Sequence, residues 1–357
     1  MIDRSSYVPL YIQIRKDIEE KILSGEIKIG DKLMSESQML RYYNVGRMTI
    51  RNALAELVSS GCVRKEKGLG TYCVMLPQTQ TPKNVHVLLN MRDTYFAPYF
   101  LTGISRVLNA NDCNLLLYDS EDSMDSMAQL LNRIMESGTD GIILQPYTGT
   151  EPVSPMCREA ILRCQDARIP LIAIDGKFQN IDTACLMNDD DYGGKIATQH
   201  AIEMGHRRIL GLFRNMYKDS KYREAGYRLA MQEAGLEPLI VDADETSFDE
   251  IRSIIASERI TAIVCYNDLL AVDCYHNFNR IGLKIAEDIS VIGYDDTELS
   301  ISSLPRITSI THPKDTMGEM AAEKLLEMMD GNIPGQFRYV FKPNLVSRDS
   351  VKNLNAG

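Results

Sequence analysis

The sequence lacks the features that mark membrane proteins and exported proteins. It has no run of about 18 consecutive apolar residues, which is the length that a transmembrane helix needs. Its first 20 residues are polar and charged, whereas a secretory signal has an apolar centre. We therefore expect a cytoplasmic protein with no membrane partner.

Disulfide and metal motifs are also missing. The eight cysteines occur singly and no C-x-x-C pair is present, so their spacing matches neither a redox pair nor a zinc site. Most of them lie inside short apolar runs, and a reducing cytosol keeps thiols free. We predict that the cysteines are small buried side chains, with no disulfide, no metal and no cofactor.

Motifs of catalysis form the third absence. The chain has no P-loop, no nucleophile elbow and no pair of carboxylates in a catalytic pattern. The glycine-containing segment 68–71 falls in a predicted hairpin, whereas a phosphate-binding loop joins a strand to a helix. We therefore expect a binding protein and not an enzyme.

Charge is unevenly distributed along the 357 residues, whose net charge is −10. Residues 1–76 carry 12 Lys/Arg against 9 Asp/Glu, while the remainder carries 27 against 40. An acidic body repels the phosphates of DNA, whereas a basic head approaches them. The length alone predicts two or three domains.

Residues 8–76 show the pattern of three helices followed by a hairpin. The first helix has apolar residues at a spacing of four and is expected to end at Ser24 and Gly25. Ser35 and Gln38 have the spacing of a capping box, which predicts a short second helix through about Tyr43. The apolar stripe of the first helix consists of Leu10, Ile14, Ile18 and Ile22.

A tight turn at residues 44–46 separates the second helix from a third, which is expected from about residue 47 to residue 60. Gly61 follows this helix as a left-handed cap. Two strands, 62–66 and 71–74, are predicted to pair across a glycine-containing tip. The predicted buried face of the third helix comprises Ile50, Leu54, Leu57 and Val58.

This helix, turn and helix arrangement is typical of DNA-binding proteins, in which the start of the second helix reaches base edges in the major groove. Arg47 and Arg51 share one face of the third helix, and arginine donates two hydrogen bonds to guanine. Thr49 is predicted to contact a phosphate or a thymine methyl group. Lys67 and Gly68 form a slim, cationic hairpin tip suited to the minor groove or the backbone. A solvated helix face is the alternative for the arginines, but the neighbouring turn and hairpin favour DNA binding.

Residues 9–74 resemble the winged-helix domain of the GntR family. The resemblance rests on NVGRMTIRNAL at 44–54 and SGCVRKEKGLGTYCV at 60–74. It implies that double-stranded operator DNA is the partner, and it places Glu36 on the glutamate that begins the family's second helix. The family's DNA contacts fall here on Arg47, Thr49, Arg51, Lys67 and Gly68. The sequence departs from the family pattern at Met34, Ser37 and Gly46.

A polar segment with two prolines at residues 75–83 predicts a linker, after which the pattern changes. Short apolar runs then alternate with amphipathic stretches, which is the signature of parallel sheets with helices on both faces. The predicted strands are 85–89, 114–119, 141–146, 171–175, 209–213, 238–242, 262–266 and 290–295.

The expected fold class is therefore α/β. A winged helix-turn-helix domain over residues 1–74 precedes a two-lobed, doubly wound parallel-sheet domain over residues 84–347, and residues 348–357 are expected to form a C-terminal tail. A ligand cleft is predicted between the lobes, at the carboxyl ends of the strands.

Polar side chains at the ends of these strands have the chemistry that a sugar requires. Hydroxyl groups need planar donors and acceptors, and the C–H faces of a sugar need aromatic rings. Arg223 follows the strand 209–213 and is predicted to hold two hydroxyls in its fork. Tyr95 and Tyr99 are candidate stacking walls. The carboxylate and amide candidates are Asp189, Asn267, Asp268 and Asp295. Capping of a following helix is the alternative for each of them, above all for Asp189.

The body resembles the regulatory domain of the LacI/GalR family, which is similar to type I periplasmic sugar-binding proteins. Matching segments include TDGIILQP at 139–146, TAIVCYNDLLA at 261–271 and EDISVIGYDD at 287–296. The resemblance implies a small sugar effector. Its best-matched binding residues are Asp189, Arg223, Asn267 and Asp295. The combination of head and body resembles the arabinose repressors, which implies L-arabinose or a similar pentose.

We therefore predict a homodimeric repressor that a small sugar releases from its operator. An effector-dependent activator or co-repressor-type regulator has the same parts, and hexoses or sugar phosphates are alternative effectors. Two other classes remain as alternatives: an enzyme acting on the sugar, for which no catalytic motif is present, and a secreted sugar-binding protein, which would not need residues 1–76.

Overall fold

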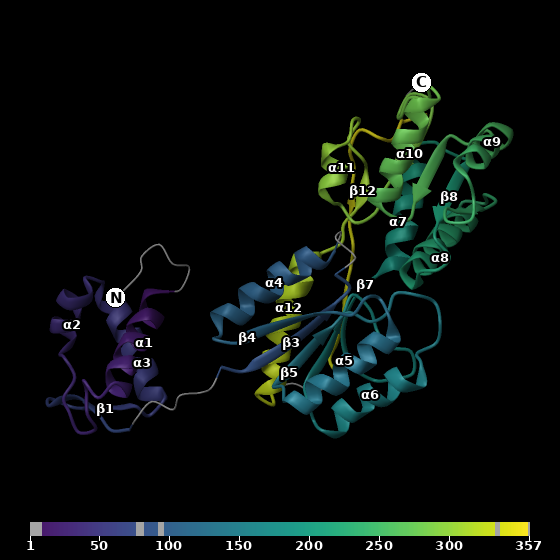
Figure 1. Cartoon of the computed structure of the whole chain (residues 1–357). Helices are drawn as coiled ribbons and strands as arrows, with labels where there is room; N and C mark the ends of the chain where they lie inside the picture. The colour runs from purple at the N-terminus through teal and green to yellow at the C-terminus, as the bar shows by residue number, and fades with distance from the viewer. Residues whose placement is uncertain (1–8, 76–81, 92–95, 333–335, 356–357) are drawn as a thin grey trace. The chain divides into compact units, whose positions relative to one another are not determined.

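The computed structural model of the chain describes residues 9–75, 82–91, 96–332 and 336–355. The chain divides into two compact units, residues 1–82 and 83–357, which we call the head and the body. Figure 1 shows both units, and most of the predicted linker, residues 76–81, lies outside the described residues. Among the described helices, none is long and apolar enough to cross a membrane.

Over residues 9–75 the head consists of three helices and a two-stranded antiparallel hairpin, as predicted. Ser35 begins the second helix with a complete capping box, which its sequence spacing with Gln38 indicated. Asn44 and Gly61 adopt left-handed conformations after the second and third helices. The elements are α1 (Leu10–Leu23), α2 (Glu36–Tyr43), α3 (Arg47–Ser59), β1 (Val63–Glu66) and β2 (Gly70–Cys73).

The prediction of the head core is wrong at one residue. Val58 is 42% exposed, and Ala53 is buried in the core instead. Successive residues of an α-helix are about 100° apart, so Val58 points well away from its neighbour Leu57. Ala53 lies three residues after Ile50 and four before Leu57, and therefore completes the same buried face.

The body has two α/β lobes, each with a parallel sheet. Among the described residues of the body, six strands of lobe 1 follow the order β13-β7-β6-β5-β3-β4, and four strands of lobe 2 follow the order β11-β10-β8-β9. The strands of lobe 1 are β3 (Asn84–Leu89), β4 (Asn114–Asp119), β5 (Gly141–Leu144), β6 (Leu171–Ile174), β7 (Ala184–Asn188) and β13 (Arg338–Phe341). Those of lobe 2 are β8 (Ile209–Phe213), β9 (Leu239–Asp242), β10 (Ala262–Cys265) and β11 (Ser290–Ile292), with a separate antiparallel pair, β12 (Ser309–Ile310) and β14 (Leu345–Val346).

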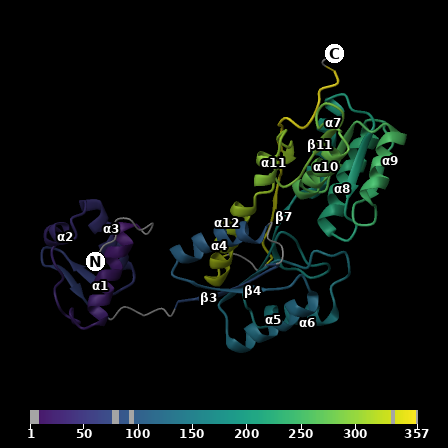
Figure 2. The same cartoon turned by 45° about the horizontal axis from the view of Figure 1, so that its top comes forward.

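Helices cover the sheets in both lobes (Figures 1 and 2). Lobe 1 carries α4 (Ala97–Ala110), α5 (Met124–Ser137), α6 (Pro155–Asp166) and α12 (Lys314–Met329). Lobe 2 carries α7 (Asp190–Glu203), α8 (Lys218–Glu233), α9 (Phe248–Glu258), α10 (Asp268–Arg280) and α11 (Glu298–Ser302). This alternation is the doubly wound α/β architecture that the sequence predicts.

All eight strands predicted for the body are present, but β7, β12, β13 and β14 were not predicted. β13 is an edge strand whose side chains are mostly exposed, so it has no continuous apolar run to mark it. Strands β7, β12 and β13 lead into the three segments by which the chain passes between the lobes. The crossings occur after β7, after β12 and after β13.

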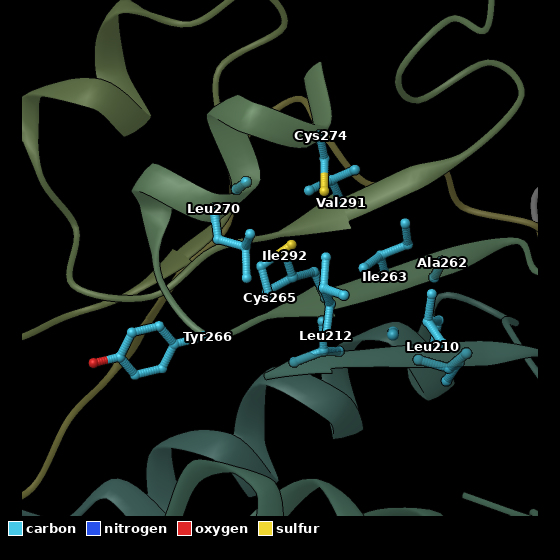
Figure 3. Packing of buried hydrophobic residues seen from close by; sticks show 14 of the residues in the cluster. Leu210, Leu212, Ala262, Ile263, Cys265, Tyr266, Leu270, Cys274, Val291 and Ile292 are labelled. Carbon is cyan, nitrogen blue, oxygen red and sulfur yellow. The ribbon is translucent and has the colours of Figure 1, made fainter. Parts of the chain in front are cut away.

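Buried aliphatic side chains fill the space between sheet and helices. Figure 3 shows this packing in lobe 2, where side chains from β8, β10 and β11 meet Leu270 and Cys274 of α10. Tyr266, at the end of β10, directs its hydroxyl away from this cluster. All eight cysteines are free and buried, which confirms their predicted role as core residues. Burial raises the pKa of the Cys157 and Cys164 thiols to about 11, so they are not nucleophilic.

The last described residues pack against lobe 2. Ser350 is fully buried and its hydroxyl donates to the carbonyl of Val291 at 2.6 Å. The backbone N–H of Leu354 donates to the carbonyl of Met204 at 2.7 Å. Residues 348–355, which the sequence suggested as a tail, are therefore part of lobe 2 in the structure.

Candidate functional site

The head presents its candidate DNA-binding residues on two adjoining elements. Arg47 is the first residue of α3, and Arg51 lies one turn later, and both side chains are exposed. Thr49, which lies between them in the sequence, has a half-buried side chain. Lys67 and Gly68 form the exposed tip of the β1–β2 hairpin, where Gly68 has a φ of +80°, a conformation that favours glycine.

Glu36 connects these elements instead of projecting freely to solvent. Its carboxylate forms ion pairs with Arg51 of α3 at 3.4 Å and with Lys65 of β1 at 2.9 Å. The hydrogen bond from Lys65 and that from Arg51 lower the pKa of Glu36 below its usual value. Glu36 therefore fixes the orientation of Arg51 relative to the hairpin. Lys65, which was not among the predicted contacts, joins the basic surface because its side chain is exposed on β1.

The substitution Glu36→Gln is expected to weaken discrimination between DNA sequences while strengthening non-specific binding. It removes a negative charge beside the surface that is predicted to face DNA and frees Lys65, but it also removes the ion pair that holds Arg51. The ratio of specific to non-specific affinity should fall by roughly tenfold. Fluorescence anisotropy on a duplex selected by this protein and on a scrambled duplex measures the ratio. An unchanged ratio would contradict the positioning role.

The body contains a cavity of about 740 Å³ that is lined by residues of both lobes. Its lining comes from segments that follow β3, β4, β5, β6 and β7 in lobe 1 and β8 and β10 in lobe 2. These are the carboxyl ends of parallel strands, where ligands bind in doubly wound folds. The volume lies within the range of small-molecule sites.

Asp189 and Asn267 line this cavity, and each also caps a helix. The Asp189 carboxylate accepts from the backbone N–H of Tyr192 at 3.2 Å at the start of α7. The Asn267 side-chain oxygen accepts from the N–H of Leu270 at 2.9 Å at the start of α10. Capping and lining are therefore compatible, because a cap holds the side chain at the strand end where the cavity lies.

Arg223 lies beneath the cavity at the centre of a buried cluster of charges. It is 2% exposed, and it pairs with Asp190 at 3.0 Å and with Asp295 at 3.2 Å. A third carboxylate, that of Asp219, lies 3.5 Å away, and the guanidinium carbon lies 3.7 Å from the centre of the Tyr294 ring. Asp190 and Asp219 line the cavity while Arg223 and Asp295 do not, so Arg223 positions the carboxylates that a ligand meets.

Two glycines allow this cluster to form. A Cβ atom on Gly194 of α7 would lie 2.0 Å from the carbonyl oxygen of Arg223, and one on Gly226 of α8 would lie 1.9 Å from that of Asp191. Helices α7 and α8 therefore approach more closely than larger residues permit. Their contact brings Asp190 of one helix to Arg223 of the other.

Burial raises the pKa of one carboxyl in the cavity lining and of one beneath it. It raises the pKa of Asp219 to about 6 even though Arg223 opposes the shift, and it raises the pKa of Asp295 as well. Tyr266 donates a hydrogen bond to Asp219 at 2.7 Å. Asp219 is thus an acceptor whose charge depends on pH close to neutrality.

Asp268 has a structural position. It is fully buried outside the cavity lining, and it accepts from the N–H of Thr297 at 2.8 Å and from the hydroxyl of Ser309 at 2.6 Å. These bonds connect α10 to the segment that follows β11, through Thr297, and to β12, through Ser309. Burial, reinforced by the charge of Asp295, raises its pKa to about 7.

The substitution Asp268→Asn is expected to stabilise the protein at high pH relative to low pH. A buried carboxyl whose folded pKa of about 7 exceeds its unfolded value contributes stability below about pH 4, and this contribution is lost as the pH rises to about 7. Asparagine keeps the shape without the charge. Urea unfolding at pH 5 and pH 8 should show the free energy of unfolding of the variant rising relative to wild type by roughly 2 kcal/mol. A difference that does not vary with pH would contradict the assignment.

The aromatic walls of the cavity differ from those predicted. Tyr99 is 36% exposed on α4 and does not line the cavity, and Tyr95 lies outside the described residues. The rings of Tyr217 and Tyr266 are stacked instead, with centroids 6.0 Å apart and planes within 3° of parallel. The aromatic residues in the lining are Phe96, Tyr147, Tyr217, Tyr222 and Tyr266. Tyr266 directly precedes Asn267 at the end of β10, so its strand-end position was a usable signal.

The cavity lining is strongly acidic. Seven of its residues carry carboxylates and three carry basic side chains. The acidic residues are Glu121, Asp122, Asp175, Asp189, Asp190, Asp191 and Asp219, and the basic ones are Lys177, Arg214 and Lys218. Within the described ranges, no group of three or more His, Cys, Asp or Glu side chains is arranged to hold a metal ion. The lining offers many hydrogen-bond acceptors and an unfavourable potential for anions.

Comparison with known families matches two parts of the chain. Residues 10–73 match the model of bacterial regulatory proteins of the gntR family, and residues 198–351 match the model of the periplasmic binding protein-like domain. The first match covers the helices and the hairpin of the head. The second covers most of lobe 2 together with α12 and β13 of lobe 1.

Similar curated proteins extend over most of the chain. An arabinose metabolism transcriptional repressor of Halalkalibacterium halodurans is 28% identical over 96% of this chain and 96% of its own length. A ribose operon repressor of Haemophilus influenzae is 27% identical over 76% of this chain and 82% of its own length. Among solved structures, a periplasmic binding protein/LacI transcriptional regulator from Alkaliphilus metalliredigens, complexed with D-xylulofuranose, has a TM-score of 0.65 at 18% identity. It covers 75% of this chain and 99% of that one.

Proposed function

Because the chain joins a GntR-type winged-helix domain to a periplasmic-binding-protein-like domain, we propose that it is a transcriptional repressor that a small, uncharged sugar releases from operator DNA. The observation that carries this proposal is the acidic, aromatic-lined cavity between the lobes of the body. Carboxylates and tyrosines in one cavity match the hydroxyls and the C–H faces of a sugar.

A pentose is the proposed effector, with L-arabinose first among the candidates. Two similar curated proteins are named for arabinose metabolism and the ribose operon, and one similar solved structure is complexed with D-xylulofuranose; these three sugars have five carbons. The two curated relatives are named as repressors, which supports regulation and not catalysis as the role of this chain.

The charge of the cavity favours neutral sugars over sugar phosphates. A phosphate group carries close to two negative charges at neutral pH and would be placed among seven carboxylates and only three basic side chains. Like charges a few ångströms apart repel strongly in a partly buried site. Arg223, the most buried cation beneath the cavity, is already shared by three carboxylates and is not available to a phosphate.

The operator side of the proposal rests on the head. Arg47 and Arg51 read base edges, while Lys65, Lys67 and Gly68 contact the phosphate backbone or the minor groove. A homodimer formed by the body would present two heads to an approximately palindromic operator. Effector binding changes the relation of the lobes, and it lowers operator affinity if the two conformations bind the sugar unequally.

A thermal-shift series tests the effector class. L-arabinose, D-ribose and D-xylulose are compared with D-arabinose 5-phosphate, each at a saturating concentration. A neutral pentose at a hundred times its Kd should add about 2.7 kcal/mol to the free energy of unfolding and raise Tm by several degrees, and the phosphate should not. A shift with the phosphate alone would overturn the neutral-sugar assignment. Tighter operator binding in the presence of the sugar would instead favour a co-repressor mechanism.

A further inference from the structure

The two lobes are joined by a contact that lies apart from the three chain crossings. The loop after β5 in lobe 1 forms a short antiparallel bridge with the segment that leads into α8 in lobe 2, with Gly149 opposite Tyr217. We call these two segments, residues 147–150 and 216–218, the clasp. In the sheet of lobe 1, β5 is separated by β6 from β7, the strand that leads into the first crossing.

Backbone hydrogen bonds hold the clasp together. The N–H of Lys218 donates to the carbonyl of Thr148 at 2.9 Å, and the N–H of Thr150 donates to the carbonyl of Met216 at 3.2 Å. The ammonium group of Lys218 adds a bond to the carbonyl of Tyr147 at 3.4 Å. Burial lowers the pKa of Lys218, as expected for an ammonium group partly removed from water.

The first hydrogen bond satisfies a helix end that has no other cap. Lys218 is the first residue of α8, and the preceding Tyr217 makes no side-chain capping bond. The first N–H groups of a helix have no intrahelical acceptor. Here the carbonyl of Thr148, from the opposite lobe, accepts one of them. The same helix carries Asp219 and Arg223, so the clasp is attached directly to the charged cluster under the cavity.

Each half of the clasp is held in place by its own lobe. In lobe 1 the carboxylate of Asp122 accepts from both the backbone N–H and the hydroxyl of Thr148. A Cβ atom at position 149 would lie 2.3 Å from the hydroxyl oxygen of Tyr147, so the ring of Tyr147 packs over Gly149 at a distance that a larger residue would not allow without a shift of that ring. In lobe 2 the ring of Tyr217 stacks on that of Tyr266. The clasp therefore joins two preformed loops.

The clasp is also a wall of the cavity, because residues from both of its halves belong to the lining, namely Tyr147, Thr148, Tyr217 and Lys218. We propose that the clasp is a latch between the lobes: it holds them together across the cavity, and it must open before a ligand enters or leaves. The proposal concerns the exchange of ligand and the preferred lobe arrangement. Only its consequence for a sugar rests on the proposed function.

The variant Lys218→Pro tests the latch with little disturbance elsewhere. Proline removes the N–H that bonds to Thr148, and the first position of a helix tolerates it. Tyr217 is extended, with φ −107° and ψ 139°, which is the conformation preferred before proline. Lys218→Ala is the matched control, because it removes the same side chain but keeps the N–H.

Hydrogen exchange of the full-length protein, without added sugar, reports on the second backbone hydrogen bond of the clasp, which Thr150 donates to Met216. The Thr150 amide should be protected in wild type and in Lys218→Ala, and it should exchange about tenfold faster in Lys218→Pro. Peptides spanning residues 145–153 and 214–222, followed by mass spectrometry, provide the measurement. Exchange of the Thr150 and Lys218 amides at the rate of an open loop in wild type would overturn the proposal.

A second pair of variants guards against misfolding of the first. Thr150→Pro removes the other backbone donor of the clasp, and Thr150→Ala keeps it. The Lys218 amide should then exchange about tenfold faster in the proline variant only. Equal exchange in both members of each pair would also overturn the proposal.

Ligand kinetics test the second half of the proposal, with L-arabinose as the probe. Stopped-flow tyrosine fluorescence should show the association and dissociation rate constants rising together in Lys218→Pro, each by several-fold, while Kd changes less than either. Unchanged rate constants in a variant whose amide has lost protection would show that the clasp does not gate the cavity. Absence of any L-arabinose binding to wild type would contradict the proposed effector, and the exchange experiments would still decide the latch.

Discussion

Replacing Arg223 by methionine is expected to lower the free energy of unfolding of the body by about 3–5 kcal/mol and to abolish the response to sugar. The substitution leaves Asp190, Asp219 and Asp295 facing one another with their shared cation removed. A buried carboxylate without a partner is far less stable than a buried pair, which explains the size of the expected loss. Urea unfolding at pH 8 measures it, and the thermal-shift assay with L-arabinose measures the response.

The pH dependence of the same variant provides an internal check. Without Arg223 the burial of Asp295 raises its pKa further, so the folded variant takes up a proton more readily than the unfolded chain. The deficit in stability should therefore shrink as the pH falls from 8 toward 5. Arg223→Lys is the control, because it keeps one positive charge but cannot span three carboxylates, and it should lie between wild type and methionine. A methionine variant as stable as wild type at pH 8 would contradict the role of the cluster.

Replacing Arg47 by alanine is expected to weaken operator binding by about 1–3 kcal/mol, roughly fivefold to more than a hundredfold in affinity, and to relax the choice of base at one position of each half-site. Arg47 is exposed at the first turn of α3, the part of a recognition helix that reaches base edges. Binding to a duplex selected by the wild-type protein, and to its single-base variants, measures both effects.

Lys67→Ala at the hairpin tip is the contrasting variant. A lysine that contacts phosphate contributes to all sequences alike, so affinity should fall uniformly and the slope of log K against log salt should decrease in magnitude by about one. Loss of sequence preference in Lys67→Ala, or retention of full preference in Arg47→Ala, would exchange the roles assigned to the helix and the hairpin.

Local signals predicted those parts of the fold that depend on neighbouring residues. The capping box at Ser35, the turn at residues 44–46, the left-handed cap at Gly61 and the apolar strands of the body follow from spacings of a few residues. The prediction of the head core fails at Val58, which is adjacent to the buried Leu57 but points to another face of the helix. Strand β13 escaped because an edge strand has little apolar content to reveal it.

The candidate site was predicted less completely, because it depends on contacts between distant segments. Asp189 and Asn267 were found because a polar residue after an apolar strand lies at the cavity in this architecture. The placement of Arg223 beneath the lining follows from the close approach of α7 and α8 at Gly194 and Gly226, which no local pattern reveals. The stacking of Tyr217 on Tyr266 likewise joins two residues that are far apart in the sequence.

The clasp shows the same limit of sequence analysis. Its hydrogen bonds join backbone groups, and a backbone carbonyl at position 148 has no identity in the sequence that marks it as the cap of a helix in another lobe. The only local trace is Gly149, whose lack of a side chain leaves room for the side chain of Tyr147.

The central claim is that a neutral sugar bound in the body controls the affinity of the head for DNA. Operator binding at increasing sugar concentration tests this claim most directly. Fluorescence anisotropy with a duplex selected by the full-length protein should show affinity falling by roughly 5- to 150-fold as L-arabinose saturates the body. The same titration on Arg223→Lys should require more sugar or show no release. Operator affinity that stays constant across L-arabinose, D-ribose and D-xylulose would contradict the account.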